Sequence, residues 1–127
     1  MKKTVLVVDD QPSNVRLIQI NLEREGYRVL TAADGVEGMQ RVQETRPDLI
    51  LLDVIMPRKD GFEMLRELKA DPELQDIPVV MLTVDVRNLA IVEGHRIGAD
   101  LYLPKPFHPK ELVSVVRRTL KEPPRGG

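Results

Sequence analysis

Acidic, basic and hydroxyl side chains stand at the ends of apolar runs in this 127-residue chain. Asp9 and Asp10 follow the first run, Asp53 closes the third, Thr83 ends the fourth, and Lys105 comes just after the fifth. Runs without polar alternation are typical of buried parallel strands, and an open parallel sheet binds its ligands outside the carboxyl ends of its strands. We therefore expect these five side chains to converge at one edge of a sheet.

Three carboxylates at neighbouring strand ends repel one another unless a cation lies between them. Oxygen ligands of this kind suit Mg²⁺. A carboxylate is ionised at neutral pH and can attack phosphorus, which gives an aspartyl phosphate. Phosphoryl transfer mainly requires positioning and charge neutralisation. The residues thus predict Asp53 as the phosphoacceptor, Mg²⁺ held by Asp9, Asp10 and Asp53, and phosphoryl oxygens bound by Thr83 and Lys105.

Each of these residues also has an ordinary structural explanation when it is taken alone. An Asp that follows a strand often caps the next helix, and Thr is common in strands. The combination is much less ordinary, because an acidic pair after the first strand is joined by an Asp, a Thr and a Lys-Pro pair after the third, fourth and fifth. The combination therefore favours a functional site.

Strand-like and helix-like segments alternate along the chain, as they do in a doubly wound parallel α/β sheet. The strands are expected near residues 4–8, 27–32, 49–53, 79–83 and 101–104. The helices are expected near residues 13–25, 36–45, 61–70, 86–97 and 109–121. The first helix has more apolar residues than one buried stripe requires, so we expect Val15 or Ile20 to face outward.

The composition excludes several classes of function. A formal net charge of −1 gives no reason to expect binding to nucleic acid or to a membrane. The absence of cysteine excludes disulfides and thiolate catalysis. No apolar stretch suits a signal peptide or a transmembrane helix, so we expect a cytoplasmic protein. We expect one domain at residues 1–121, with a tail or the start of a linker at residues 122–127. His95 and His108 belong to no ligand-spaced cluster and are expected on a helix surface and at a helix start.

From residue 4 to about residue 120, the chain resembles the receiver domain of bacterial two-component response regulators. The resemblance is carried by Val7–Asp10, Pro47–Asp53, Met56–Pro57, Asp60–Gly61, Thr83, Gly98–Ala99 and Tyr102–Phe107. It implies a flavodoxin-like (βα)5 sheet of strand order 2-1-3-4-5. It also implies that Asp53 accepts a phosphoryl group from a histidine kinase or a phosphotransfer protein. Such a domain is not an enzyme with an external substrate, because it catalyses only its own phosphorylation and dephosphorylation.

The resemblance also implies roles for residues that chemistry alone did not single out. The backbone carbonyl of Ile55 completes the Mg²⁺ shell of the three carboxylates. Thr83 and Tyr102 form a conformational switch that reports phosphorylation. The peptide bond before Pro106 is expected to be cis, the isomer that proline makes accessible.

Some residues depart from the family's habits. Val84 stands where Ala or Gly is usual, and it either narrows access to the pocket or is accommodated by repacking of the loop. Ile55 offers no polar group that could align an attacking water. Ile91, Leu101 and Val115 stand where DNA-binding relatives dimerise through charged residues. They predict an apolar contact with a second copy or an output partner, unless Leu101 packs under Val115 within the monomer.

Two other functions are compatible with the same fold class, but the site residues argue against both. A phosphatase with an aspartyl nucleophile usually needs a second acid near the nucleophile, but Val54 and Ile55 follow Asp53. A flavodoxin-like electron carrier needs a phosphate loop rich in Ser, Thr and Gly after the first strand, where Gln11–Asn14 stands instead. The chain also offers few aromatic side chains that could stack on a flavin ring, since it has two Tyr, two Phe and no Trp.

Overall fold

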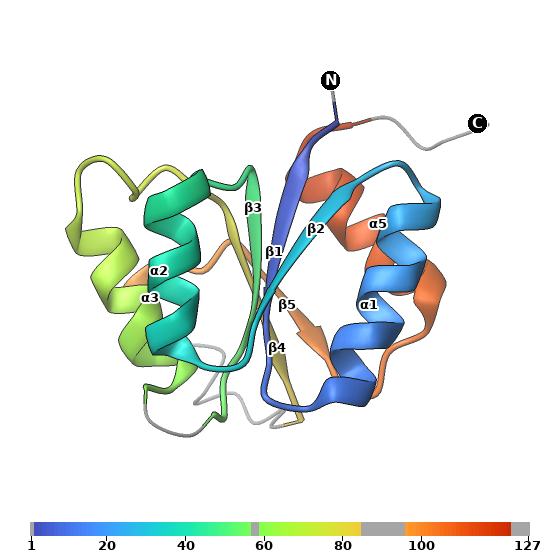
Figure 1. Cartoon of the computed structure of the whole chain (residues 1–127), viewed down its shortest axis with the longest axis horizontal. Coiled ribbons are helices and arrows are strands. Elements are labelled where there is room, and N and C mark those ends of the chain that lie inside the picture. Colours follow the sequence, from blue (N-terminus) through green and yellow to red (C-terminus); the bar gives the residue numbers. More distant parts are fainter. Residues whose placement is uncertain (1, 57–58, 85–95, 123–127) are drawn as a thin grey trace.

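The computed structural model describes residues 2–56, 59–84 and 96–122 of the chain. Its five strands form one parallel sheet with the order β2-β1-β3-β4-β5, and helices cover both faces of the sheet (Figure 1). The strands are β1 (Thr4–Val8), β2 (Arg28–Ala32), β3 (Leu49–Asp53), β4 (Val79–Thr83) and β5 (Leu101–Pro104). The described helices are α1 (Pro12–Arg24), α2 (Gly35–Thr45), α3 (Gly61–Ala70) and α5 (Pro109–Thr119). The predicted fold and strand order are confirmed.

The helix expected at residues 86–97 lies almost wholly outside the described residues, of which 96 and 97 are helical. Within the described parts of the chain, no helix is both long and apolar enough to cross a membrane.

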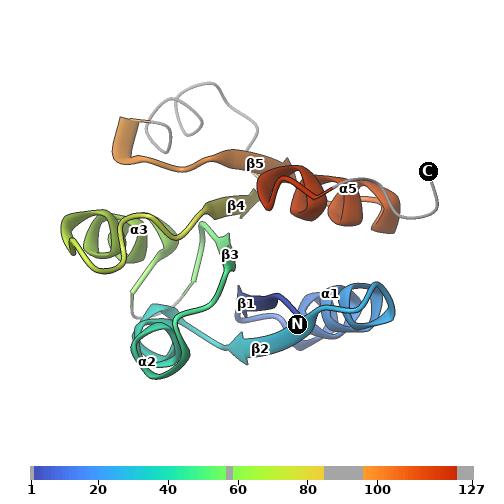
Figure 2. The ribbon, with the colours of Figure 1, turned by 90° about the horizontal axis from the view of Figure 1, so that it is seen from above.

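Two layers of helices enclose the sheet. Figure 2 shows α1 and α5 on one face and α2 and α3 on the other. Because successive residues of a strand point to opposite faces, Leu6 and Leu52 join the buried cluster under α2 and α3, whereas Val7 and Leu51 join the cluster under α1 and α5. β3 and β4 are buried along their whole length, as expected of strands that are apolar on both faces.

α1 turns a narrower apolar stripe to the core than its sequence offers. Ile18 and Leu22 are fully buried, and Val15 is partly buried against the same cluster. Ile20 is 46% exposed, which confirms that one of the two suspected residues faces outward. Leu17 is 40% exposed as well, although its apolar side chain predicts burial.

Side-chain caps fix where the helices around the sheet edge begin. Asp34 accepts a hydrogen bond from the backbone N–H of Glu37 at the start of α2, and Asp60 accepts one from Glu63 at the start of α3, both at 2.9 Å. His108 caps α5, and its Nδ1 accepts the backbone N–H two residues further on. The predicted helix-start position of His108 is confirmed.

The last turn of α5 is tied to the corner between α1 and β2. The Tyr27 hydroxyl donates to Glu122 Oε1 at 2.6 Å. Arg117 pairs with Glu25 at 2.9 Å, and its guanidinium lies 5.6 Å from the centre of the Tyr27 ring. These contacts join segments that are more than 90 residues apart in the sequence.

Candidate functional site

The carboxyl ends of adjacent strands bring the predicted site residues to one edge of the sheet. In the register of the sheet, the last residue of β1 pairs with the residue before Asp53, and Asp53 pairs with the residue before Thr83. Thr83 pairs with the residue before Lys105. The backbone N–H of Lys105 itself donates to the Thr83 carbonyl at 2.7 Å. The register alone therefore aligns four strand ends.

Three carboxylates and one ammonium meet at this edge. Asp9, Asp10 and Asp53 each offer a carboxylate oxygen within 4.8 Å of the other two. Lys105 Nζ lies 2.7 Å from Asp9 Oδ2 and 3.3 Å from Asp53 Oδ2. Asp9, Asp53 and Thr83 are buried, whereas Asp10 is exposed. The structure thus brings together the five residues that the sequence singled out for chemistry.

The electrostatics of this cluster favour a bound cation. Burial, followed by the neighbouring Asp9 carboxylate, raises the pKa of Asp53 to about 6. Lys105 and the backbone N–H of Ile55 only partly oppose this shift. One ammonium against three carboxylates leaves an excess of negative charge, and the donors are carboxylate oxygens, which suit Mg²⁺. The residues present therefore fit a magnesium ion.

Apolar side chains flank the buried carboxylate. The backbone N–H of Ile55 points at Asp53 Oδ1 over 3.4 Å, while the Ile55 side chain is 63% exposed. Val84, directly after Thr83, is 65% exposed. The side chains of Ile55 and Val84, the two residues that differ from the usual family pattern, are therefore exposed to solvent.

Tyr102 and Pro106 lie on β5 and in the loop that follows it. Tyr102 is two register positions from Thr83 on the neighbouring strand, and it is partly buried against the cluster under α2 and α3. The peptide bond between Lys105 and Pro106 is cis. The aromatic ring thus belongs to the strand next to the one that carries Thr83.

The expected contact face is only partly described. Leu101 and Val115 are partly buried against the cluster under α1 and α5, so both pack on the core of the monomer. Ile91 and His95 lie outside the described residues.

Sequence reasoning gave Gly61 no role beyond the motif it belongs to. The structure places the backbone of Gly61 against the backbone of Asp53 and Val54, and the Gly61 N–H donates to the Val54 carbonyl at 2.9 Å. The sequence signal for this contact is an Asp-Gly pair at the start of a helix, a short distance after Asp53.

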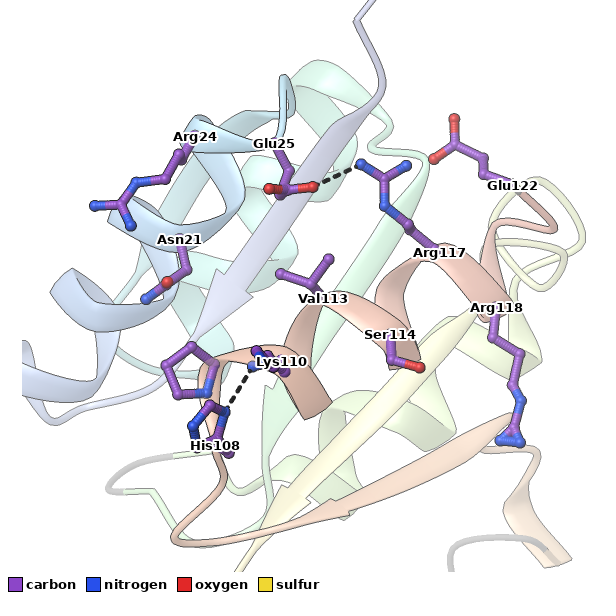
Figure 3. A pocket seen from close by; sticks show the side chains of 11 residues that line it. Asn21, Arg24, Glu25, His108, Lys110, Val113, Ser114, Arg117, Arg118 and Glu122 are labelled. Carbon is purple, nitrogen blue, oxygen red and sulfur yellow. Dashed lines mark hydrogen bonds and ion pairs between the residues drawn. The ribbon is translucent and has the colours of Figure 1, made fainter. Parts of the chain in front are cut away.

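A surface groove of about 1100 Å³ lies elsewhere, between α1 and α5 (Figure 3). Its walls carry both charge signs, and Glu25 and Arg117 pair with each other across it. None of the five clustered residues lines this groove. The groove is therefore separate from the acidic site.

The sequence matches one protein family over most of its length. The family model of the response regulator receiver domain matches residues 5–117. The chain belongs to this family. It is a receiver domain of the two-component response regulators. The comparisons support neither the phosphatase nor the electron carrier.

Curated relatives and solved structures extend the match. The transcriptional regulatory protein PhoP of Bacillus subtilis, named for alkaline phosphatase synthesis, is 43% identical over 121 residues, which are 95% of this chain and 50% of PhoP. The receiver domain therefore spans about half the length of the curated relatives it matches. The chemotaxis protein CheY4 of Vibrio cholerae is 35% identical with a TM-score of 0.90, covering 94% of this chain and 99% of that one. The Mn²⁺-bound form of response regulator Rcp1 is 33% identical with a TM-score of 0.79, covering 91% and 90%.

Proposed function

We propose that this receiver domain accepts a phosphoryl group on Asp53 from a histidine kinase or a phosphotransfer protein. The observation that carries the proposal is the buried Asp53 carboxylate, held beside Asp9, Asp10 and Lys105 at one edge of the sheet. An Asp53 oxygen forms a bond to phosphorus while the P–N bond of the phosphohistidine breaks, and the imidazole nitrogen keeps the electron pair of that bond. The domain catalyses this transfer and the later hydrolysis, in which a water oxygen bonds to phosphorus and Asp53 leaves as the free carboxylate, and it catalyses only its own phosphorylation and dephosphorylation.

Asp9, Asp10, Asp53 and the backbone carbonyl of Ile55 are the proposed ligands of Mg²⁺. The Mn²⁺-bound form of Rcp1 supports a divalent ion in this fold, and the acidic cluster supports it in this chain. When bound, the ion neutralises the charge that gathers on the phosphoryl oxygens.

Lys105 and Thr83 are the proposed partners of the transferred group. The Lys105 ammonium already lies within 3.3 Å of an Asp53 oxygen, so it is placed to pair with a phosphoryl oxygen bonded there. The Thr83 hydroxyl, at the end of the next strand, donates to another phosphoryl oxygen.

We further propose that Thr83 and Tyr102 form the switch. A phosphoryl group shifts a conformational equilibrium only if its contacts differ between the two states, and a hydrogen bond from Thr83 supplies such a difference. The position of Tyr102 on the strand next to that of Thr83 supports its part in the switch. Its ring resonances should change when the phosphoryl mimic beryllofluoride is added, and an unchanged ring environment would remove the coupling.

The domain is proposed to act through protein contacts and not by touching nucleic acid. It occupies residues 1–121, and its net charge of −1 suits this assignment. The candidate contact face, with Ile91, Leu101 and Val115, would serve a second copy or an output partner.

Acetyl phosphate tests the central proposal directly. Incubation with acetyl phosphate and Mg²⁺ should add one phosphoryl group to the intact mass, and peptide mapping should place it on Asp53. Asp53→Asn should abolish labelling, whereas Asp76→Asn, which removes an exposed carboxylate away from the site, should leave it intact. Labelling that persists in Asp53→Asn or in EDTA contradicts the assignment.

A further inference from the structure

The start of α3 is packed directly against the backbone that carries Asp53. A Cβ atom added to Gly61 would strike the Asp53 carbonyl oxygen and would lie 2.9 Å from Cα of Val54. Only glycine allows this approach, because any larger residue must push the two backbones apart. The hydrogen bond of 2.9 Å from the Gly61 N–H to the Val54 carbonyl fixes the contact in register.

The neighbours of Gly61 hold the start of α3 in place. The Asp60 side chain accepts the Glu63 N–H at 2.9 Å and so defines where the helix begins. Lys59 Nζ bonds both carboxylate oxygens of Glu67 at 2.6 Å, which ties the preceding residue to the body of α3. Met64 and Leu65 of the same helix are fully buried in the core. These contacts therefore hold the first residue of α3 against the Asp53–Val54 peptide.

We propose that Gly61, with Asp60 as the cap that places it, is a positioning element for the phosphoacceptor. The contact fixes how far the Asp53 carboxylate reaches toward Asp9 and Lys105 at the sheet edge. Phosphoryl transfer depends mainly on positioning, and a displacement of about 1 Å costs on the order of 100-fold in rate. This inference rests on the proposed phosphorylation of Asp53.

The first test compares two glycine substitutions at a temperature well below the melting point of each variant. Gly61→Ala should lower the rate of labelling by acetyl phosphate with excess Mg²⁺ by about 10- to 100-fold per folded molecule. The ¹⁹F resonances of its beryllofluoride complex should shift as well. Gly26→Ala is the control, because it strains a left-handed turn (φ 94°) between α1 and β2, where its Cβ would meet no atom within 4 Å. It should label at the wild-type rate.

The second test covers the case in which Gly61→Ala does not fold. Asp60→Ala removes the cap and should slow labelling about three- to tenfold, because the start of α3 frays. Asp60→Asn keeps a capping side chain without the charge and should restore the wild-type rate within a factor of about two. Tyr27→Phe is the control for stability, because it removes the 2.6 Å hydrogen bond between Tyr27 and Glu122, in the part of the fold where α5 ends. It should lose similar thermal stability and keep its labelling rate.

The outcomes separate this inference from the function on which it rests. If wild-type protein is not labelled on Asp53, the proposed function fails. If wild-type protein is labelled, and folded Gly61→Ala or Asp60→Ala matches its rate, the function stands and the positioning role is overturned. Equal slowing by Asp60→Ala and Tyr27→Phe also overturns it, because the effect would then follow stability alone.

Discussion

At the scale of single residues, the fold makes the Asp53 carboxyl harder to ionise than an Asp carboxyl in water. Its pKa is raised to about 6 because the carboxyl is buried and faces Asp9. A raised carboxyl pKa means that the folded state binds the proton more tightly than the unfolded state does. The stability contributed by protonation is present below the ordinary carboxyl pKa and is lost as the pH rises through about 6. At neutral pH, the ionised Asp53 carboxylate therefore lowers the stability of the metal-free folded state.

Asp53→Asn should consequently stabilise the metal-free protein at pH 7. We expect about 1 kcal/mol after allowing for solvent screening, which is a rise of a few degrees in melting temperature. The difference between the two proteins should shrink as the pH falls through about 6 and should vanish near the ordinary carboxyl pKa. Thermal melts of both proteins in EDTA across this range measure it. A difference that is constant with pH would contradict the charge argument.

We expect Ile55 to affect a different property, the lifetime of the phosphoryl group on Asp53. Hydrolysis needs a water held in line with the bond to Asp53, and the apolar, exposed side chain of Ile55 offers it no hydrogen bond. Ile55→Asn should speed the loss of the phosphoryl group several-fold, because general positioning of water contributes factors of this order or more. Intact mass followed over time after removal of acetyl phosphate measures the rate. Ile55→Leu is the matched control, and equal lifetimes in the two variants would refute the role.

At the scale of elements, the strands were predictable because their apolar runs are unbroken. The bounds of β1, β3, β4 and β5 match the prediction, and β2 differs by one residue at its start. The described helices differ by no more than two residues at either end, since proline and glycine mark most of their limits. The convergence of the acidic residues was predictable as well, because it follows from strand order alone.

Other features depend on tertiary contacts that no local pattern encodes. The exposure of Leu17 depends on how α1 is rotated against the sheet and α5, and its apolar character alone suggested burial. The approach of Gly61 to Asp53 depends on where α3 is docked. The distances from Lys105 to the two buried carboxylates likewise come from the path of the loop after β5 and not from spacing in the sequence.

The end of α5 is stabilised by one such long-range contact. Tyr27 is buried, and burial and the carboxylate of Glu122 raise the pKa of its hydroxyl above its usual range. Tyr27→Phe keeps the ring under Arg117 but removes the hydrogen bond to Glu122. We expect a loss of about 1–2 kcal/mol, seen as a lower melting temperature and faster amide exchange at residues 117–122. Glu122→Gln keeps an acceptor and should lose less. If Tyr27→Phe melts at the same temperature as the wild type, the hydrogen bond to Glu122 contributes nothing to stability.

At the scale of the whole molecule, the acidic site and the proposed contact face lie in different parts of the fold. The acidic site lies at the carboxyl edge of the sheet, whereas Leu101 and Val115 belong to β5 and α5. In the proposed switch, Thr83 on β4 and Tyr102 on β5 connect Asp53 to that face. The side chains on that face would determine what kind of contact the switch controls.

Self-association through this face should be insensitive to salt. Leu101 and Val115 are apolar and partly buried on the core of the monomer, so neither can contribute an ion pair across an interface. Ion pairs between exposed charges weaken as the ionic strength rises, whereas apolar contacts do not. Sedimentation of the beryllofluoride-treated protein at low and high salt should therefore give the same coefficient at both, whether the protein is a monomer or a dimer. Val115→Lys separates these cases: it should dissociate an apolar dimer and leave a monomer unchanged. A dimer that forms at low salt and dissociates at high salt would show that charged residues elsewhere on the molecule hold it together.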